Sequence, residues 1–188
     1  NKSKNTLSFG YIENNLKSHQ LNFIHKLHTN WLFDLNSILE NKVSISENFE
    51  SKNHNLNKFK INPKITYIFN ESNRLNFYYQ FYTNENTIGN FEELKQQKLG
   101  LSCYLSKSEK LNFTSEINYF NNSFKGNPNT IIGYILMEGL QVGSNYTWSF
   151  TAQKKLTKFL DLNLSYFGRK SENSNSIHNG NIQLRAIF

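Results

Sequence analysis

Three histidines could serve as general bases, because each lies beside a predicted long connection: His19, His54 and His178. A histidine base needs a carboxylate that orients its ring. The only aspartates are Asp34 and Asp161, and the glutamates near these connections are Glu47, Glu50, Glu85 and Glu138. Their spacing ties none of them to a histidine, and the sequence has no serine-elbow, paired-histidine or phosphate-loop motif. We therefore expect no enzymatic activity, cofactor or metal, and a hydrolase or acyltransferase at the rim of the fold is our third functional hypothesis.

The single cysteine, Cys103, excludes an internal disulfide and a thiolate metal cluster. It falls in the same period-two row as Leu99, Leu101 and Leu105. We therefore expect it to behave as a small apolar side chain rather than as a reactive thiol.

The net charge of +7 and the isoelectric point near 9.4 would suit nucleic acid, anionic lipid or lipopolysaccharide as partners. Nucleic-acid bases need aromatic rings in the same groove as the lysines and arginines. Here the aromatic rows alternate with the charges and so lie on the opposite face. We expect lipid and lipopolysaccharide as partners, and no nucleic acid.

Strands must position these side chains, because apolar residues recur at every second position. The sequence has no apolar stretch of about 18 residues that could form a spanning helix, whereas a spanning strand needs only about 9–11 residues. Pro63 has no backbone N–H to donate to a neighbouring strand, so it predicts a bulge or a local sheet edge within the row 59–69. The apolar rows lie within residues 7–11, 21–27, 31–39, 59–69, 75–81, 99–105, 111–119, 146–152, 160–166 and 180–188.

The opposite face of each predicted strand is polar, and we expect it to line the lumen of a barrel. Its predicted charge network consists of Asp34, Lys60, Lys64, Arg74, Glu116, Asp161, Arg169 and Arg185. A charge in a narrow lumen needs a partner, so a network that neutralises itself is the simplest interpretation. An ion or proton path is the alternative, and a wider barrel would place the same residues around a larger lumen.

Aromatic placement separates a barrel from a soluble β-sandwich, which would also have one apolar and one polar face per strand. Large aromatic residues tend to lie near strand ends, with leucine, isoleucine and phenylalanine between them. This distribution is typical of aromatic girdles at two membrane interfaces. The predicted girdle residues are Tyr11, Tyr67, Tyr119, Trp148 and Tyr166.

The connections alternate between two kinds. Short ones are expected at 28–30, 70–73, 106–109 and 155–158, and longer hydrophilic ones at about 13–18, 47–55, 84–93 and 170–176. Outer-membrane barrels alternate short periplasmic turns with longer outside loops in this way. The two sets should therefore lie at opposite ends of the strands.

The segment 131–137 is apolar on both faces, so it needs cover from the barrel rim, a partner or its own packing. If it were a separate crossing, the short turn at 155–158 would fall on the wrong side. We therefore predict a long rim excursion over 121–145, or one extended, bulged strand over 130–154. Either choice leaves ten strands, with both ends of the chain periplasmic.

The chain ends on a row of Gly180, Ile182, Leu184, Ala186 and Phe188. A terminal phenylalanine that closes such a row resembles the closing strand of bacterial outer-membrane β-barrels. The resemblance implies that these residues are the C-terminal signal read by the barrel insertion machinery. No apolar segment follows Asn1 that could serve as a secretory signal, so we expect a removed signal or further upstream sequence.

A further resemblance covers about the last quarter of the chain: residues 138–148 (EGLQVGSNYTW), 166–171 (YFGRKS), 177–180 (IHNG) and 183–188 (QLRAIF). This stretch resembles the C-terminal end of large, poorly characterised outer-membrane proteins of Bacteroidota. The resemblance implies a Gram-negative outer membrane and periplasmic domains upstream, and it supplies no activity.

The sequence as a whole therefore predicts one domain over residues 1–188, an all-β antiparallel transmembrane β-barrel of about ten strands, complete or the C-terminal part of a larger barrel. Barrel closure satisfies every backbone donor inside lipid. The first functional hypothesis is a non-enzymatic anchor or subunit of an envelope assembly that contacts other envelope proteins. The second is an outer-membrane transport or export channel.

Overall fold

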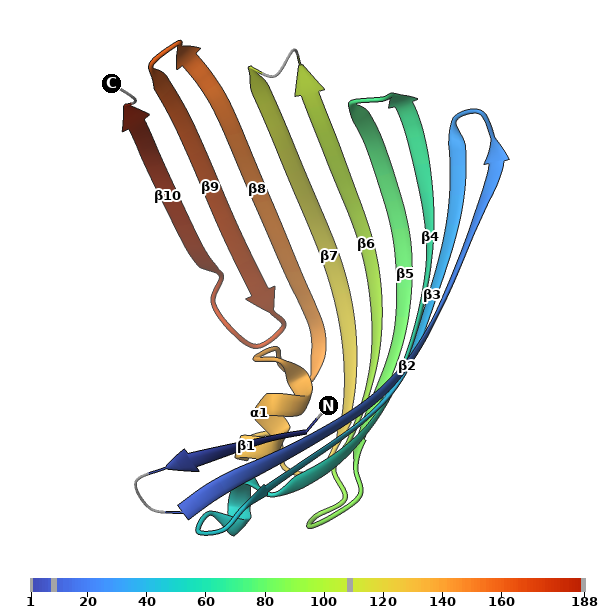
Figure 1. Cartoon of the computed structure of the whole chain (residues 1–188), viewed down its shortest axis with the longest axis vertical. Coiled ribbons are helices and arrows are strands. Elements are labelled where there is room, and N and C mark those ends of the chain that lie inside the picture. The colour runs from blue at the N-terminus through green and yellow to red at the C-terminus, as the bar shows by residue number, and fades with distance from the viewer. Residues whose placement is uncertain (1, 8–9, 108–109, 187–188) are drawn as a thin grey trace.

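The structure is a computed structural model that describes residues 2–7, 10–107 and 110–186. Ten strands form one antiparallel sheet in which each strand pairs with its neighbours in the chain (Figure 1). The strands are β1 (Lys2–Leu7), β2 (Gly10–His28), β3 (Trp31–Ser46), β4 (His54–Asn70), β5 (Asn73–Asn86), β6 (Glu93–Lys107), β7 (Leu111–Lys125), β8 (Gly143–Thr157), β9 (Leu160–Ser171) and β10 (Ile177–Ala186). A short 3₁₀ helix, η1 (Glu50–Lys52), and one α-helix, α1 (Ile131–Met137), complete the described chain.

The strand pairing keeps the apolar rows in register across the sheet. Trp31 lies opposite Tyr67, Ile117 opposite Trp148, and Leu164 opposite Ile182. Because side chains alternate between faces, this register places the apolar rows on the convex face and the polar rows on the concave face. The sheet curves strongly and is open between β1 and β10 (Figure 1). The predicted all-β antiparallel fold of ten strands is confirmed, and the sheet has the curvature of a barrel wall.

Tight turns and long connections lie at opposite ends of the strands, as predicted (Figure 1). At the turn end, β2 to β3, β4 to β5 and β8 to β9 are each joined by two residues. The register shifts by one residue beside each of these three turns. The long connections lie at the other end, which we call the loop end, and include η1 and α1.

The predicted connection at 13–18 is wrong. These residues lie inside β2, which begins at Gly10 with a φ of 100° and pairs with β3 as far as Ser46. The first strand is therefore not the row 7–11, because the connection from β1 to β2 falls within that row. A strand that extends past the apolar band needs no apolar alternation, which is why its hydrophilic sequence resembles a loop.

Pro63 causes neither the predicted bulge nor an edge. It lies in β4, in the middle of the sheet, and pairs in continuous register with Leu35 of β3. On the β5 side, Ile61 pairs with Phe81 and Lys64 with Tyr78, so the same register resumes after the proline. The missing donor interrupts the ladder locally without shifting it.

Residues 131–137 form helix α1 within the predicted rim excursion, so the alternative of one bulged strand over 130–154 is wrong. The hydroxyl of Thr130 caps the helix by accepting a hydrogen bond from the Gly133 backbone N–H at 3.0 Å. The inward side of the helix packs on inward-facing residues of β4 to β7. The resulting cluster consists of Ile132, Leu136, Met137, Leu56, Tyr82 and Leu94, with Phe124 against it. The inner wall of the sheet thus covers one side of the apolar segment, while Ile131 and Tyr134 on its other side stay exposed.

We predict that Leu136→Ala loosens α1 from the wall, because Leu136 is fully buried and a buried leucine truncated to alanine costs about 2–5 kcal/mol. Hydrogen exchange of residues 126–142 should accelerate strongly. The matched control is Ile131→Ala on the same helix, where the side chain is 49% exposed and exchange should stay near wild type. Equal exchange in both variants would contradict the packing described.

Candidate functional site

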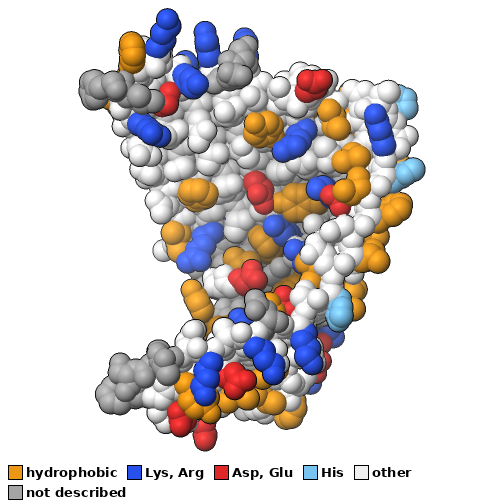
Figure 2. Space-filling model, in the orientation of Figure 1, with side chains coloured by type: hydrophobic (Ala, Val, Ile, Leu, Met, Phe, Trp, Pro, Cys, Tyr) orange, Lys and Arg blue, Asp and Glu red, His pale blue; other side chains and the backbone are white. Residues whose placement is uncertain are grey.

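Charged side chains line the concave face of the sheet (Figure 2). Several cavities are hollowed into it. One of about 380 Å³ lies between β7 and β10, and its polar lining includes Glu116, Asn118, Arg169 and Asn179. Another, of about 370 Å³, lies between β3 and β7 beside the end of α1, and is lined by Ile38, Glu40, Lys58, Lys60, Gln80, Tyr82, Gln96, Lys98, Phe120 and Glu138.

A hydrogen-bonded group joins β5 to β7 on this face. The hydroxyl of Tyr78 lies 2.6 Å from both Glu116 Oε1 and Asn118 Oδ1. Asn118 Nδ2 also donates to Glu116 Oε1 at 2.9 Å. To reach β7, the Tyr78 ring crosses β6 at Gly100, where an added Cβ would lie 2.1 Å from the ring. Gly100 therefore provides the space that the group requires.

Lys98 of β6 is held beside this group. Its Nζ lies 3.8 Å from Glu116 Oε1. The same Nζ lies 5.1 Å from the centroid of the Tyr78 ring and 5.2 Å from that of Phe120, within the range of cation–π attraction. Two aromatic rings thus position Lys98. The Glu116 carboxylate that it contacts also accepts hydrogen bonds from Tyr78 and Asn118.

Only one ion pair with both partners in the predicted lumen network is present among the described residues. Lys64 Nζ lies 2.8 Å from Asp34 Oδ2. Glu116 pairs instead with Lys98, and Lys60 lines the cavity between β3 and β7. The predicted charges share a face but do not form one continuous chain of contacts.

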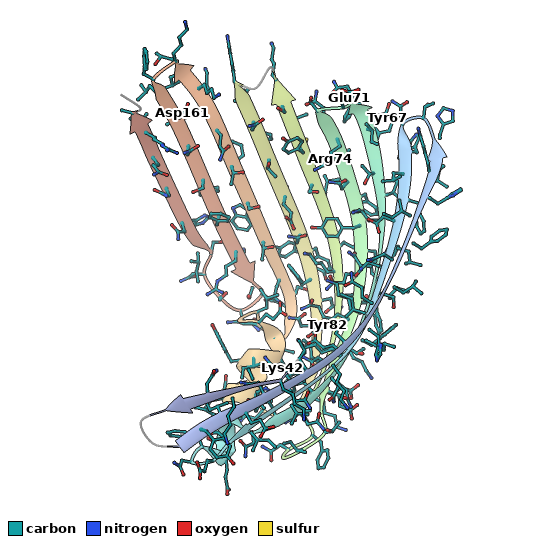
Figure 3. All side chains as sticks on the ribbon, viewed as in Figure 1. Lys42, Tyr67, Glu71, Arg74, Tyr82 and Asp161 are labelled. Carbon is teal, nitrogen blue, oxygen red and sulfur yellow. The ribbon has the colours of Figure 1, made fainter. Side chains whose placement is uncertain are left out.

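The remaining predicted charges are spread over the sheet (Figure 3). Arg74, near the turn end, lies over the Tyr104 ring at 5.1 Å. Arg169 Nη1 donates to the backbone oxygen of Gly139 at 3.4 Å and so connects β9 to the excursion. Asp161 and Arg185 are cross-strand neighbours on β9 and β10.

Sequence reasoning missed several residues of this face. Lys58 forms an ion pair with Glu40 at 3.1 Å, and neither was in the predicted network. Lys98 and Tyr78 were also missed, although both fall on even-numbered positions that share the polar face of β5 and β6. Their even positions alone would have assigned both residues to the polar face. Their contacts with Glu116, however, could be known only from the register between the strands.

The three candidate histidines do not form a cluster. His19 and His178 belong to the outward rows of β2 and β10, and His54 lies on the inner face at the start of β4. His54 is 6% exposed, and its Nδ1 lies 2.8 Å from the Lys52 backbone oxygen. Burial lowers the pKa of this rim histidine, so its neutral form is favoured. His178 instead bonds to the Tyr166 hydroxyl at 2.7 Å.

The predicted girdle residues lie at different levels along the strands, with Tyr166 near the middle of β9. Near the turn end, Tyr67 contacts Trp31 with ring centroids 4.8 Å apart. Towards the loop end, Tyr119 contacts Tyr146 at 5.2 Å. Trp148 and Tyr166 both contact His178, at 5.6 and 6.0 Å. Tyr11, at the start of β2, lies under the ammonium group of Lys4 at 3.8 Å.

The predicted C-terminal signal lies on the outward row of β10. Gly180, Ile182, Leu184 and Ala186 pair with Tyr166, Leu164, Leu162 and Leu160 of β9. Phe188 lies outside the described residues. Cys103 lies on the outward row of β6 as a free, partly exposed thiol.

Within the described ranges, no group of three or more histidine, cysteine, aspartate or glutamate side chains could hold a metal ion. None of the helices in that part of the chain combines the length and the hydropathy needed to cross a membrane.

No protein-family model matches the chain, and no curated protein matches it. Among solved structures, the chain is similar to the translocator domain of autotransporter NalP from Neisseria meningitidis. The TM-score is 0.44 and the sequences are 11% identical, over 97% of this chain and 70% of that chain. The description of the fold therefore rests on the strand pairing of this chain itself.

We predict that Gly100→Ala displaces the Tyr78 ring and breaks its bond to Glu116, which should destabilise the protein by about 1–3 kcal/mol. The matched control is Gly180→Ala, because a Cβ there meets no atom closer than 3.9 Å. Urea unfolding of both variants in detergent measures the difference. Equal midpoints would show that the ring does not depend on Gly100.

Proposed function

We propose that this chain forms the membrane-embedded wall of an outer-membrane β-barrel of a Gram-negative bacterium, acting as a non-enzymatic anchor or subunit of an envelope assembly. Its partners would be outer-membrane lipid, lipopolysaccharide, the insertion machinery and other envelope proteins. The observation that carries this proposal is the exposed apolar convex face of the sheet.

The convex face exposes large apolar side chains on every strand from β2 to β10. Their exposed fractions are far above those of a buried core, for example 52% for Phe23, 53% for Phe77 and 56% for Ile117. The wholly apolar core cluster, by contrast, lies on the concave side under α1. A soluble protein rarely exposes so extensive an apolar surface, whereas lipid would cover it. The other exposed members of these outward rows are Leu21, Leu27, Trp31, Leu39, Ile65, Phe69, Leu99, Leu101, Leu105, Leu111, Tyr146, Phe150, Tyr166, Ile182 and Leu184.

The strands also have the length that a crossing needs. The strands β2 to β10 contain between 10 and 19 residues, and a tilted transmembrane strand needs about 9–11. The longest of them continue past the apolar band towards the loop end, as outer-membrane strands do above the membrane. Strand length and the exposed face therefore support the same arrangement.

The open edges of the sheet require partner strands in lipid. Among the described residues, β1 covers β2 only over Gly10–Asn15, and β10 pairs only with β9. Unpaired backbone groups in the hydrocarbon region cost several kcal/mol each. Because β10 and β2 run in the same direction, an antiparallel closure would place β10 beside the strand that contains β1.

Helix α1 supports anchoring over free passage. It covers the inner wall of β4 to β7 at the loop end, and the hydrogen bonds of Asn122 and Asn145 to the Gln141 backbone oxygen, at 3.0 and 2.7 Å, fasten the segment behind it. An open channel needs a continuous lumen, whereas a fastened helix narrows it. Loops held in this way can instead present a fixed surface to other envelope proteins.

A transport or export channel is the second candidate, and the hollow, lysine-lined concave face favours it. A hydrolase or acyltransferase is not favoured, because His19, His54 and His178 lie on different faces and strands. The likeness of the last quarter of the chain to Bacteroidota proteins remains a prediction about its origin.

We predict that Leu101→Lys destabilises the protein in lipid vesicles by about 2–4 kcal/mol, because Leu101 lies in the middle of the outward row of β6. The matched control is Leu105→Lys on the same strand and face, beside the turn, where about 0–1 kcal/mol is expected. The two side chains are 44% and 41% exposed, so a water-exposed face would give equal, small effects. Urea unfolding in vesicles, followed by heat-modifiable gel migration, measures both.

We predict that the purified protein conducts little current in planar bilayers, since α1 occupies the loop end. Deletion of residues 127–141 with a short glycine linker should raise the conductance if the remaining lumen is continuous. Large, steady conductance in the wild type would contradict the anchoring role and support the channel instead.

A further inference from the structure

The cavity between β3 and β7 is lined by three lysines and two glutamates. Lys58 is paired with Glu40 at 3.1 Å. Lys98 lies 3.8 Å from Glu116, whose Oε1 is already close to the Tyr78 hydroxyl and to Asn118 Nδ2. Lys60 is half-buried in the cavity lining and has no ion pair within the described part of the chain. Lys60 can therefore hold an anion, and Lys98, whose ammonium group has three N–H donors, can share one with it while it keeps its contact with Glu116.

The other lining groups suit the polar remainder of an organic anion. Gln80 and Gln96 flank the two lysines on β5 and β6 and offer amide donors and acceptors. The Tyr82 hydroxyl accepts a hydrogen bond from Asn84 Nδ2 at 2.9 Å, which leaves its own O–H available as a donor. Phe120 and Ile38 supply an apolar side to the cavity. Amide and hydroxyl donors beside cations match a hydroxylated carboxylate or phosphate.

Glu138 places a carboxylate at the same cavity. It follows the last residue of α1, with a φ of 53° in the left-handed region, and its backbone N–H bonds to the Tyr134 oxygen. Helix docking through Leu136 and Met137 thereby fixes this acidic side chain in the lining. A bound anion must approach a fixed negative charge, so Glu138 opposes binding.

From this arrangement we propose that the cavity binds a small organic anion with a hydroxylated body, held by Lys60 and Lys98 and weakened by Glu138. The site goes beyond the anchoring role, and it does not depend on whether the protein conducts. The shared chemistry is an anionic group next to hydroxyls, whether the anion is a carboxylate or a phosphate.

Isothermal titration calorimetry of the full chain in detergent tests the site with three probes: gluconate, glucose 6-phosphate and neutral glucose. The wild type should bind at least one of the anions and bind glucose at least about tenfold more weakly. Comparison of the first two probes distinguishes a carboxylate from a phosphate. Raising the salt concentration should weaken binding, because the attraction is electrostatic.

Three variants assign the binding to this cavity. Lys60→Gln should weaken anion affinity about fivefold or more, and Glu138→Gln should strengthen it about threefold or more. The matched control is Lys95→Gln. Lys95 lies on the same strand as Lys98 but in the outward row, and it pairs with Glu93 at 2.9 Å. The anion affinity of this variant should match that of the wild type. Gain of affinity in Glu138→Gln cannot result from misfolding, so the test does not rely on loss alone.

Three results would overturn the proposal: no heat of binding with either anion, equal affinity for glucose, or equal losses in Lys60→Gln and Lys95→Gln. None of these would affect the vesicle experiment with Leu101→Lys. Failure of the ligand site and failure of the membrane assignment are therefore distinguishable.

Discussion

The antiparallel hydrogen-bond ladder from β2 to β10 determines where every side chain of the sheet points. A shift of one residue would exchange the two faces of a strand. The observed register instead keeps the apolar rows together on the convex side, including across Pro63, where the ladder is interrupted but not shifted. The apolar convex surface and the polar concave surface follow from this one constraint, and so does the position of each charge on the concave surface.

Helix α1 is the main departure from this regular pattern, and it affects both the loop end of the sheet and the lysine-lined cavity. Its inward residues Ile132, Leu136 and Met137 pack on the inner wall, where Leu56, Tyr82 and Leu94 would otherwise be exposed on the concave face. The same packing narrows the loop end and brings Glu138 to the lysine-lined cavity. A single local feature thus bears on both anchoring and ligand affinity.

Alternation in the sequence was enough to predict the fold class, the number of strands and the ends at which turns and loops lie. It failed where alternation carries no information. The first part of β2 has no apolar row because it extends beyond the apolar band, and 131–137 has no alternation because it is a helix. For the site, parity assigned residues such as Lys60 and Glu116 to one face. It could not show that Glu116 meets Lys98 and Tyr78, because those contacts depend on inter-strand register and on the space left by Gly100.

The proposed position of the convex face in lipid can be measured with the two tryptophans of the chain. Trp31 begins β3 at the turn end, and Trp148 lies on the outward row of β8 towards the loop end. The protein should be refolded into vesicles that contain lipids brominated near the headgroup or near the chain end. We expect the tryptophan fluorescence to be quenched, and more strongly by bromines near the headgroups, since both rings lie towards the edges of the apolar band. Fluorescence that is unchanged by bromines at either depth would contradict this position.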